Sequence, residues 1–219
     1  MSFQRARTEE QRVERRRVIL ETAAAMLAEM PVSDVALNEL SRRVGLAKSN
    51  VLRYFESREA VLLVLLDGEL EEWSAELTQI VVGSKAALRR RSAKLAKQMA
   101  ATMAARPVLC DLISAQAAVL ERNVSAEVAL RHKQATVVTV ERLAALVTRG
   151  CPELSSRESY KVVAHMLLMA SAVWPHSQPS QAVQEAYALD SKIAKAQMGF
   201  VETVADSVDL CILGLVSRH

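Results

Sequence analysis

Residues 36–55 read ALNELSRRVGLAKSNVLRYF, and this stretch decides the fold of the N-terminal part of the chain. Two short segments with helical apolar spacing flank Gly45, a residue suited to the left-handed cap that ends a helix. The spacing predicts one helix over about 36–44 and a second over about 48–55. The residues expected to be buried between them are Leu40, Val44, Leu46, Val51 and Phe55. The stretch therefore predicts a helix-turn-helix.

Polar residues gather near the start and on the outer face of the second predicted helix. In a DNA-binding helix-turn-helix, such residues reach base edges in the major groove while the first helix crosses the backbone. Lys48 would contact guanine or phosphate and Asn50 adenine or phosphate. Short helix pairs with a glycine turn are also common in proteins that do not bind DNA, so both interpretations stay open. The candidate DNA-binding residues of this region are Asn38, Lys48, Ser49, Asn50, Arg53, Tyr54 and Arg58, the last three suited to phosphates.

A basic segment precedes the helix-turn-helix. Residues 1–20 contain six arginines and three glutamates, a local charge of +3 that equals the net charge of the whole chain. A basic arm leading into a helix suits phosphate contact, because neutralising phosphates releases counterions. A solvated N-terminus without a DNA role is the alternative. The candidates for DNA contact in this arm are Arg15, Arg16 and Arg17.

The chain resembles the TetR family of one-component repressors in about its first quarter. The resemblance rests on the apolar pattern of residues 19–27, on the turn GLAKSNV at residues 45–51, and on the run RYFESREAVL at residues 53–62. The rest of the chain resembles the family only in helix number, length and order. The resemblance implies a ligand-responsive transcriptional repressor that binds a near-palindromic operator as a homodimer and is released by a small molecule of unknown identity.

The sequence departs from the family pattern in the helix-turn-helix itself. Ala36 stands where the family caps the first helix of the motif with threonine, a loss of roughly 1 kcal/mol. Ala47 stands where serine is usual. Leu52 replaces a tyrosine that commonly touches the DNA backbone, and Tyr54 lies on a different face of the helix. A helical ligand-binding or adaptor protein that has lost operator recognition is therefore the alternative function.

Composition predicts an all-α protein of two domains. The 219 residues include only 6 glycines and 5 prolines, and aromatic residues make up 4%. This mixture favours helices over strands. We expect a basic arm and helix-turn-helix over residues 1–60, joined by a long helix to an effector-binding and dimerisation domain over residues 61–219. The remaining predicted helices cover about 10–30, 57–80, 85–106, 107–120, 125–149, 155–174 and 187–216, with a break at Gly83-Ser84 and a loop over 174–181.

Several classes of protein are disfavoured by missing patterns. The three cysteines are widely spaced and the four histidines show no metal-ligand spacing, so we expect no metal or other cofactor. No nucleophile or phosphate-loop motif is present, and we expect no enzymatic activity. The longest apolar stretch, residues 162–174, is too short to span a bilayer, and the N-terminus lacks a signal-peptide pattern. A cytoplasmic protein without membrane association is therefore expected.

The family resemblance implies an effector pocket among the middle helices and a dimer formed by the last two major helices. The apolar stretch 162–174 and the stripe of the final helix favour such a dimer, and a central core helix is the alternative. Methionine suits adaptable ligand binding but is more often core filler. The candidate ligand-binding residues are Trp73, Met99, Met103, Cys110, Gln116, His165 and Met169.

The long helix that begins near Arg58 is the expected route of communication. Arg58 would lie near DNA, whereas Trp73 lies four turns further along, towards the expected pocket. A ligand shifts an equilibrium only when it binds one state better than the other. The hypothesis is that ligand binding swings this helix and changes the spacing of the two DNA-reading helices in the dimer.

Overall fold

A computed structural model describes residues 2–79 and 86–218, with the backbone alone in residues 2–8. Within these residues the regular secondary structure is helical, and no strand occurs. The predicted all-α class is therefore confirmed. The predicted break at Gly83-Ser84, Ile80 and the predicted helix start at Lys85 lie outside the described residues. The helices are α1 (Ser2–Glu29), η1 (Val32–Asp34), α2 (Leu37–Val44), α3 (Lys48–Val51), α4 (Arg58–Thr78), α5 (Leu88–Ala104), α6 (Pro107–Ala115), η2 (Gln116–Leu120), α7 (Ala126–Gly150), α8 (Ser156–Ser177), α9 (Gln181–Leu189), α10 (Ser191–Ala194) and α11 (Phe200–Val216).

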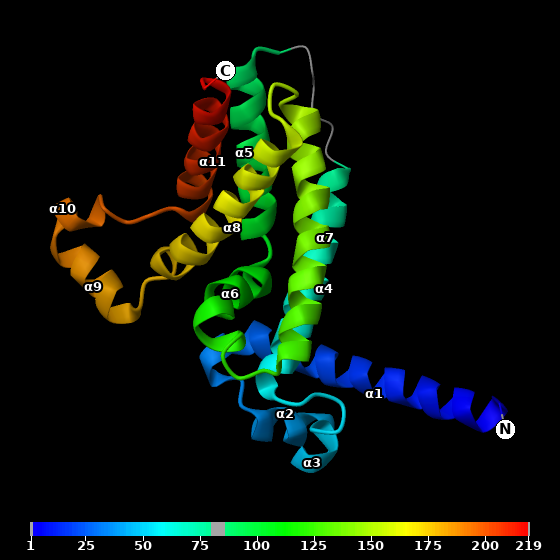
Figure 1. Ribbon diagram of the computed structural model, residues 1–219. Helices are drawn as coiled ribbons and strands as arrows, with labels where there is room; N and C mark the ends of the chain where they lie inside the picture. Colours follow the sequence, from blue (N-terminus) through cyan, green and yellow to red (C-terminus); the bar gives the residue numbers. More distant parts are fainter. Residues whose placement is uncertain (1, 80–85, 219) are drawn as a thin grey trace.

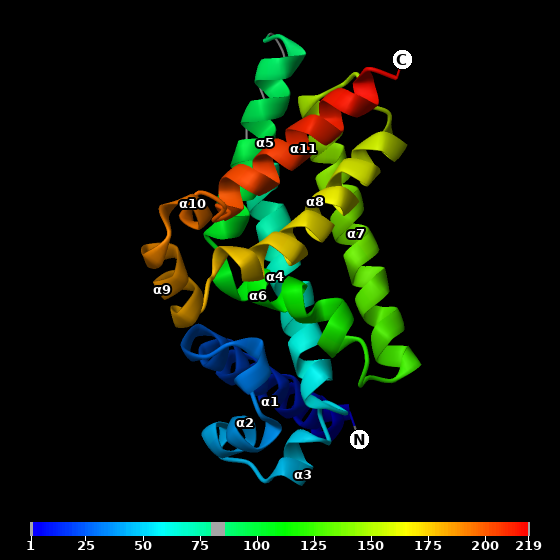
Figure 2. The same cartoon turned by 90° about the vertical axis from the view of Figure 1, so that its left-hand side faces the viewer.

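The helices form a small head and a larger body. The head consists of α1, α2 and α3, and the body of α4 to α11. In Figure 1 the head lies at the lower end, and α4 rises from it through the body beside α7. Figure 2 shows α8 and α11 crossing one face of the body, with α5 against α11. One continuous set of buried apolar residues runs from Ile19 in the head to Leu215 in the body.

Local signals predicted most helix ends in the body correctly. The Ser57 hydroxyl accepts a hydrogen bond from the Ala60 amide and starts α4. Pro107 occupies the first turn of α6. Ser155 and Glu158 form the predicted capping box at the start of α8, because each side chain bonds the other residue's backbone N–H. These helices begin where short-range chemistry satisfies their first backbone N–H groups.

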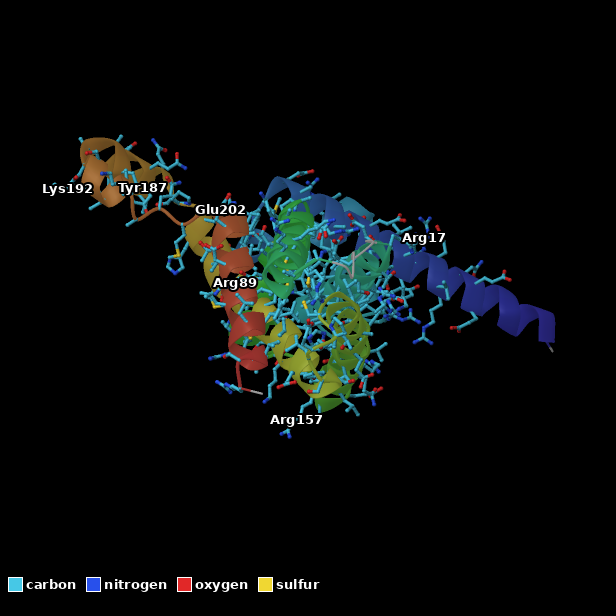
Figure 3. The ribbon with its side chains drawn as sticks, turned by 90° about the horizontal axis from the view of Figure 1, so that it is seen from above. Arg17, Arg89, Arg157, Tyr187, Lys192 and Glu202 are labelled. Atoms are coloured by element: carbon cyan, nitrogen blue, oxygen red, sulfur yellow. The ribbon has the colours of Figure 1, made fainter. Side chains whose placement is uncertain are left out.

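The first helix begins earlier than predicted. It runs from Ser2, whereas the sequence predicts a start near residue 10 with an arm before it. Residues 2–29 contain neither glycine nor proline and are rich in good helix formers, so nothing interrupts the helix before Pro31. The basic segment is therefore the first part of α1, which extends away from the body beyond Arg17 (Figure 3).

The recognition-type helix is shorter than predicted. Helix α3 ends at Val51, and residues 52–54 form a tighter turn in which the Tyr54 amide donates to the Val51 carbonyl at 2.9 Å. This turn brings Phe55 into the core, where its side chain is 4% exposed. Phe55 is therefore buried as predicted, but it reaches the core through this turn and not as part of a helix that continues to residue 55.

The predicted loop over residues 174–181 is mostly helix. Helix α8 continues through Pro175 to Ser177 and α9 begins at Gln181. Trp174 holds this end in place, since its indole N–H donates to Asp111 Oδ1 at 2.6 Å and its ring meets Phe200 edge-on at 5.2 Å. These tertiary contacts keep the helix regular past the proline.

The predicted final helix is divided. Asp190 has an extended backbone and caps α10 by accepting from the Lys192 amide at 2.7 Å, and residues 195–199 then separate α10 from α11. Helices α9 and α10 contain no buried residue and project from the body, where Figure 3 shows Tyr187 and Lys192. The stripe expected to be continuous is therefore confined to α11.

Candidate nucleic-acid interface and ligand cavity

The turn between α2 and α3 depends on Gly45. Its φ of 72° lies in the left-handed region, where a residue with a Cβ is strained. The Gly45 and Leu46 amides donate to the Arg42 and Ser41 carbonyls at 3.2 and 3.0 Å, which closes the helix end. Leu40 and Val51 are fully buried on either side of the turn. The angle between α2 and α3 is therefore set by one glycine and a shared core.

The first turn of α3 presents its polar side chains to solvent. Lys48, Ser49 and Asn50 are all exposed, and Arg53 follows them on the exposed turn. Asn38 is exposed in the first turn of α2. Because Val51 faces the core, the exposed side chains form the outer surface of the head at the end opposite the body (Figure 1). This is the arrangement by which a recognition helix enters the major groove.

Arg16 has a different role from the one predicted. Its Nη1 donates to the Tyr54 carbonyl at 2.5 Å, and its guanidinium carbon lies 4.2 Å from the centre of the Phe55 ring. Burial lowers the pKa of this guanidinium, and the nearby charges of Arg12 and Arg131 add to the effect. Arg16 therefore joins α1 to the turn after α3 and is engaged inside the protein.

Arg17 and Arg58 are also engaged within the chain. Arg17 pairs with Glu14 and Glu21 on the exposed side of α1. Arg58 lies 3.0 Å from Glu59 and donates to the Ser33 and Val35 carbonyls at 3.4 Å, which ties the start of α4 to η1. Neither guanidinium is left wholly available for phosphate.

Arg15 remains exposed and faces a groove between α1 and the turn after α3. The groove is open and has a volume of about 1100 Å³. Arg12, which was not among the residues predicted to bind DNA, lines it together with Arg15 on α1 and with Arg53. The predicted helix over about 10–30 already contains Arg12 and Arg15, and their three-residue spacing on one helical face is the signal that could have indicated Arg12. The residues that line the groove are Glu9, Glu10, Gln11, Arg12, Glu14, Arg15, Val18, Arg53 and Tyr54.

Two of the departures from the family pattern, Ala36 and Leu52, lie at the surface of the head. Ala36 precedes α2 with no side-chain hydrogen bond to the helix start. Leu52 is 39% exposed on the outer side of the head. The recognition region thus has an uncapped first helix and an apolar side chain at its surface.

The body contains an apolar cavity of about 370 Å³ among α4, α6, η2, α7 and α8. Of the seven residues predicted to bind a ligand, only Gln116 lines it. The cavity lies nearer to α7 and α8 than the prediction placed it. Its walls are formed by Leu70, Ile113, Gln116, Ala117, Glu121, Lys133, Thr136, Val140, Tyr160, Ala164, Leu167, Leu168 and Ser171.

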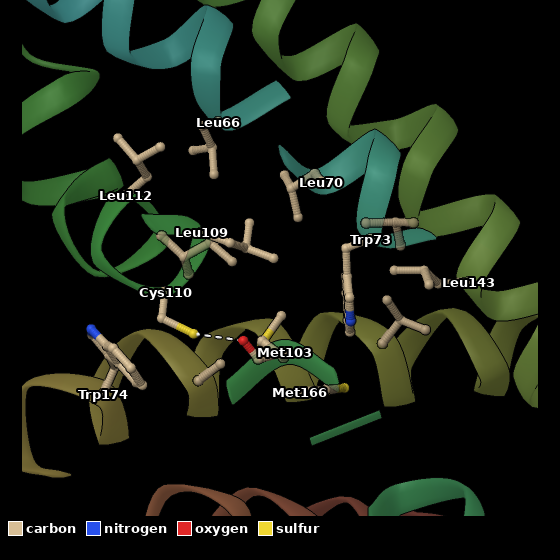
Figure 4. Close-up of a cluster of buried hydrophobic side chains, with 14 of the residues drawn as sticks. Leu66, Leu70, Trp73, Met103, Leu109, Cys110, Leu112, Leu143, Met166 and Trp174 are labelled. Carbon is tan, nitrogen blue, oxygen red and sulfur yellow. Dashed lines mark hydrogen bonds between the residues drawn. The ribbon is translucent and has the colours of Figure 1, made fainter. Parts of the chain in front are cut away.

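The other predicted ligand residues fill the core. Met99 and Met103 are fully buried, and the Cys110 thiol donates to the Met103 carbonyl at 3.3 Å (Figure 4). Burial raises the pKa of Cys110 to about 12, so the thiol stays protonated. The Trp73 indole N–H donates to Thr102 Oγ1 at 3.0 Å. These side chains therefore pack between helices, as the alternative interpretation of the methionines as core residues expects.

His165 and Met169 lie on the side of α8 away from the cavity lining. His165 Nε2 lies 2.7 Å from Ser207 Oγ on α11, so it joins the two helices. Met169 is half-buried against the core. Helical spacing indicated that both residues would be enclosed but could not say by what.

A polar network centred on the buried His132 adjoins the cavity, and sequence reasoning missed it. His132 on α7 is 1% exposed, with Nδ1 2.6 Å from Asp67 Oδ1 on α4 and Nε2 2.9 Å from the Gln116 amide nitrogen. That amide also donates to Glu121 Oε1 at 2.7 Å, and Lys133 Nζ donates to the same oxygen at 2.6 Å. Asp67, Glu121 and His132 come from separate elements, so no sequence spacing links them.

A hydrogen bond joins the turn after α3 to the start of α7. Glu56, between α3 and α4, accepts a hydrogen bond on Oε1 from the Ser125 amide at 2.5 Å. This bond lowers the pKa of the Glu56 carboxyl, since it favours the charged form. Ser125 is itself the N-cap of α7. The turn after α3 is therefore anchored to the helix that carries His132.

Among the described residues, no group of three or more histidine, cysteine, aspartate or glutamate side chains is arranged to hold a metal ion. In the same part of the chain no single helix is long and apolar enough to cross a membrane; only Leu88–Ala104 and Pro107–Leu120 taken together, bent by 91°, reach that length and hydropathy.

The head and body together define the class of helix-turn-helix regulators with an all-helical second domain. Residues 19–65 match the family model for bacterial regulatory proteins of the tetR family, and residues 67–219 match the model for the tetracycline repressor-like C-terminal domain. The chain belongs to the TetR family.

One relative matches part of the chain in sequence, and two solved structures match most of it in fold. The HTH-type transcriptional regulator EthR of Mycobacterium tuberculosis is 39% identical over 54 residues, 25% of each chain, so the match spans a quarter of that relative's length. A TetR regulator from Rhodococcus sp. RHA1 has a TM-score of 0.56 at 13% identity, covering 94% of this chain and 99% of that one. The fatty acid degradation regulator FadR from Bacillus halodurans has a TM-score of 0.55 at 15% identity, covering 90% and 97%. The structural likenesses show a shared fold.

Proposed function

We propose that this chain is a cytoplasmic, non-enzymatic repressor that binds a near-palindromic DNA operator as a homodimer and leaves it when a small molecule occupies the cavity of the body. The observation that carries the proposal is the exposed set Lys48, Ser49 and Asn50 at the start of α3, on a helix whose opposite face is buried at Val51. Such residues supply major-groove contacts, and Asn38, Arg53, Arg15 and Arg12 add phosphate contacts around them.

The proposed homodimer is supported by exposed leucines on α8 and α11. The two helices pack on each other, and each leaves a leucine, Leu168 and Leu210, 70% exposed in the single chain. Exposed apolar side chains on neighbouring helices favour burial against a second copy, and a two-fold dimer presents two identical heads. Two heads read two half-sites in successive major grooves, which is why a near-palindrome is expected.

Ligand response is supported by the connection of the cavity to the head. The network of Asp67, Gln116, Glu121 and His132 joins the cavity wall to α4, and the bond from Ser125 to Glu56 joins α7 to the turn after α3. A ligand that fits only one arrangement of these contacts shifts the population of heads able to bind DNA. These contacts connect the cavity wall to α4 and to the turn after α3, and they are the proposed route by which ligand binding moves α4.

The test is binding of the purified protein to the DNA upstream of its own coding region. Fluorescence anisotropy should show saturable binding that outcompetes scrambled DNA of equal length. Affinity should fall with salt with a slope of about 0.9 for each phosphate neutralised. A footprint should cover two half-sites about one helical turn apart.

The second candidate function is a helical ligand-binding or adaptor protein without operator recognition. It is favoured by the exposed Leu52 and the uncapped start of α2 at Ala36. The same assay separates the two functions, because an adaptor would show no sequence preference even at low salt. Binding to upstream and scrambled DNA with equal affinity would decide for the adaptor.

A further inference from the structure

The cavity has apolar walls and one polar end, and the polar end limits which ligands fit. The polar end consists of Gln116, Glu121, Lys133 and Thr136, and the remaining wall is largely aliphatic. A buried polar group is stable only when its hydrogen bonds are satisfied. The donors and acceptors that the protein leaves unused at this end therefore define the chemistry of the ligand.

The amide of Gln116 has no hydrogen left to donate. Its nitrogen lies 2.7 Å from Glu121 Oε1 and 2.9 Å from His132 Nε2. An amide oxygen in that position would repel the carboxylate, so the nitrogen faces both groups and uses both its hydrogens. His132 Nε2 is then an acceptor, and the ring proton resides on Nδ1, where it is donated to Asp67 at 2.6 Å. The buried donors of Gln116 and His132 are thus all engaged by the protein.

Acceptors, in contrast, remain available. Within the described residues both hydrogen bonds to the Glu121 carboxylate, from Gln116 and Lys133, fall on Oε1, and none falls on Oε2. Burial raises the pKa of Glu121, but the hydrogen bonds from Lys133 and Gln116 outweigh it and lower the pKa overall, so the carboxyl is ionised. In the same part of the chain, the buried Oγ1 of Thr136 has no hydrogen-bond partner.

The charges at this end favour a cation over an anion. The side chains of Glu121 and Asp67 are each 23% exposed, whereas that of Lys133 is 55% exposed and can move into solvent. An anionic ligand would meet the Glu121 carboxylate with the Asp67 carboxylate behind it. A cation can donate to Glu121 Oε2, the oxygen that Lys133 leaves unused.

We propose that the cavity binds an apolar molecule that carries a protonated nitrogen, which donates to the free Oε2 of Glu121. This proposal rests on the ligand cavity of the proposed function and names its ligand class. The ammonium draws Glu121 away from Gln116, which loosens the Gln116 bond to His132. His132 transmits the change to Asp67 on α4, the helix that begins in the DNA-reading end at Arg58.

The test compares three probes with the same alkyl chain, octylamine, octanoate and octanol, by isothermal titration calorimetry on the full-length protein without DNA. Octylamine should bind at least about tenfold more tightly than the other two, as a charge-assisted bond requires. Glu121→Gln should remove that preference, so that octylamine binds no more tightly than octanol. The matched control Glu127→Gln, a 79% exposed glutamate on α7, should retain it.

Equal affinity for the three probes, tighter binding of octanoate, or no binding of octylamine would each overturn this ligand class. Operator binding is measured without ligand, so failure of either experiment leaves the other interpretable. Nitrogen-15 NMR of the histidine side chains gives a second readout. The His132 ring should show the Nδ1–H form in the free protein and shift with octylamine in the wild type but not in Glu121→Gln. An unchanged His132 signal with octylamine bound would contradict transmission to α4.

Discussion

Lys48 and Asn50 occupy exposed positions on either side of Ser49 at the start of α3, and in the proposed function they supply most of the base contacts. Lysine offers donors to guanine, and the asparagine amide pairs with adenine through a donor and an acceptor. Both side chains project from a helix whose fold depends on other residues, such as Val51. Their removal should therefore affect recognition without unfolding the head.

The double variant Lys48→Ala, Asn50→Ala should lose its preference for operator DNA over scrambled DNA. Each good base contact contributes about 1 to 3 kcal/mol, so a loss of at least about tenfold in specificity is expected. Competition anisotropy measures it. The control Lys97→Ala, Asn123→Ala removes the same residue types from exposed positions in the body and should bind like the wild type. Specificity that survives in the double variant would show that α3 does not read the bases.

Gly45 and Gly68 give opposite predictions for the same substitution. Gly45→Ala should destabilise the protein by about 1 kcal/mol, because alanine is strained at a φ of 72° although nothing lies near the new Cβ. Gly68 lies inside α4, also with open space at its Cβ, so Gly68→Ala should stabilise by about 0.5 to 1 kcal/mol. Urea unfolding measures both changes. Two changes of the same sign would contradict this assignment of backbone strain.

At the scale of elements, α1 and the turn after α3 are held together by Arg16. Its guanidinium joins the Tyr54 carbonyl to the face of the Phe55 ring. A charge-assisted hydrogen bond and a cation–π contact act together at this point. The residue predicted from charge as a DNA contact therefore orients the recognition helix instead.

Arg16→Met should destabilise the protein by about 1 to 2 kcal/mol and weaken binding to operator and scrambled DNA by a similar factor. The neighbouring control Arg15→Met should change stability by less than about 0.5 kcal/mol, because Arg15 is exposed. Denaturant melts and anisotropy report the two effects separately. Unchanged stability in Arg16→Met, with a selective loss of operator binding, would return Arg16 to the DNA interface.

At the scale of the whole molecule, the proposed function requires two heads held at a defined separation. The exposed leucines of α8 and α11 provide the proposed contact, and the head is joined to the same body through α4 and the Glu56–Ser125 bond. A change at the dimer face should therefore alter DNA binding without touching the recognition helix.

Leu210→Glu should convert the dimer into a monomer, since it places a charge in the apolar contact between two copies. Light scattering coupled to size-exclusion chromatography measures the mass, and circular dichroism should show unchanged helix content because Leu210 is 70% exposed in the single chain. Leu130→Glu makes the same change at a 58% exposed leucine of α7 and should leave the dimer intact. A dimeric Leu210→Glu would place the interface elsewhere.

The sequence by itself determined the all-α class, the Gly45 turn, and the starts of α4, α6 and α8. These features depend on caps, proline and glycine, whose effects extend over a few residues and are visible in any chain. The exposed residues of α3 followed from the same short-range spacing, because Val51 had to face inward.

Only the tertiary structure decided where α3 and α8 end, how Arg16 is used, and where the cavity lies. Helical spacing shows that Met99 or Met103 is enclosed, but whether another side chain or an empty volume faces it depends on residues far away in the chain. The polar network beside the cavity brings together Asp67, Gln116 and His132 from three elements. Such a juxtaposition is set by the packing of the helices and therefore leaves no pattern in the sequence.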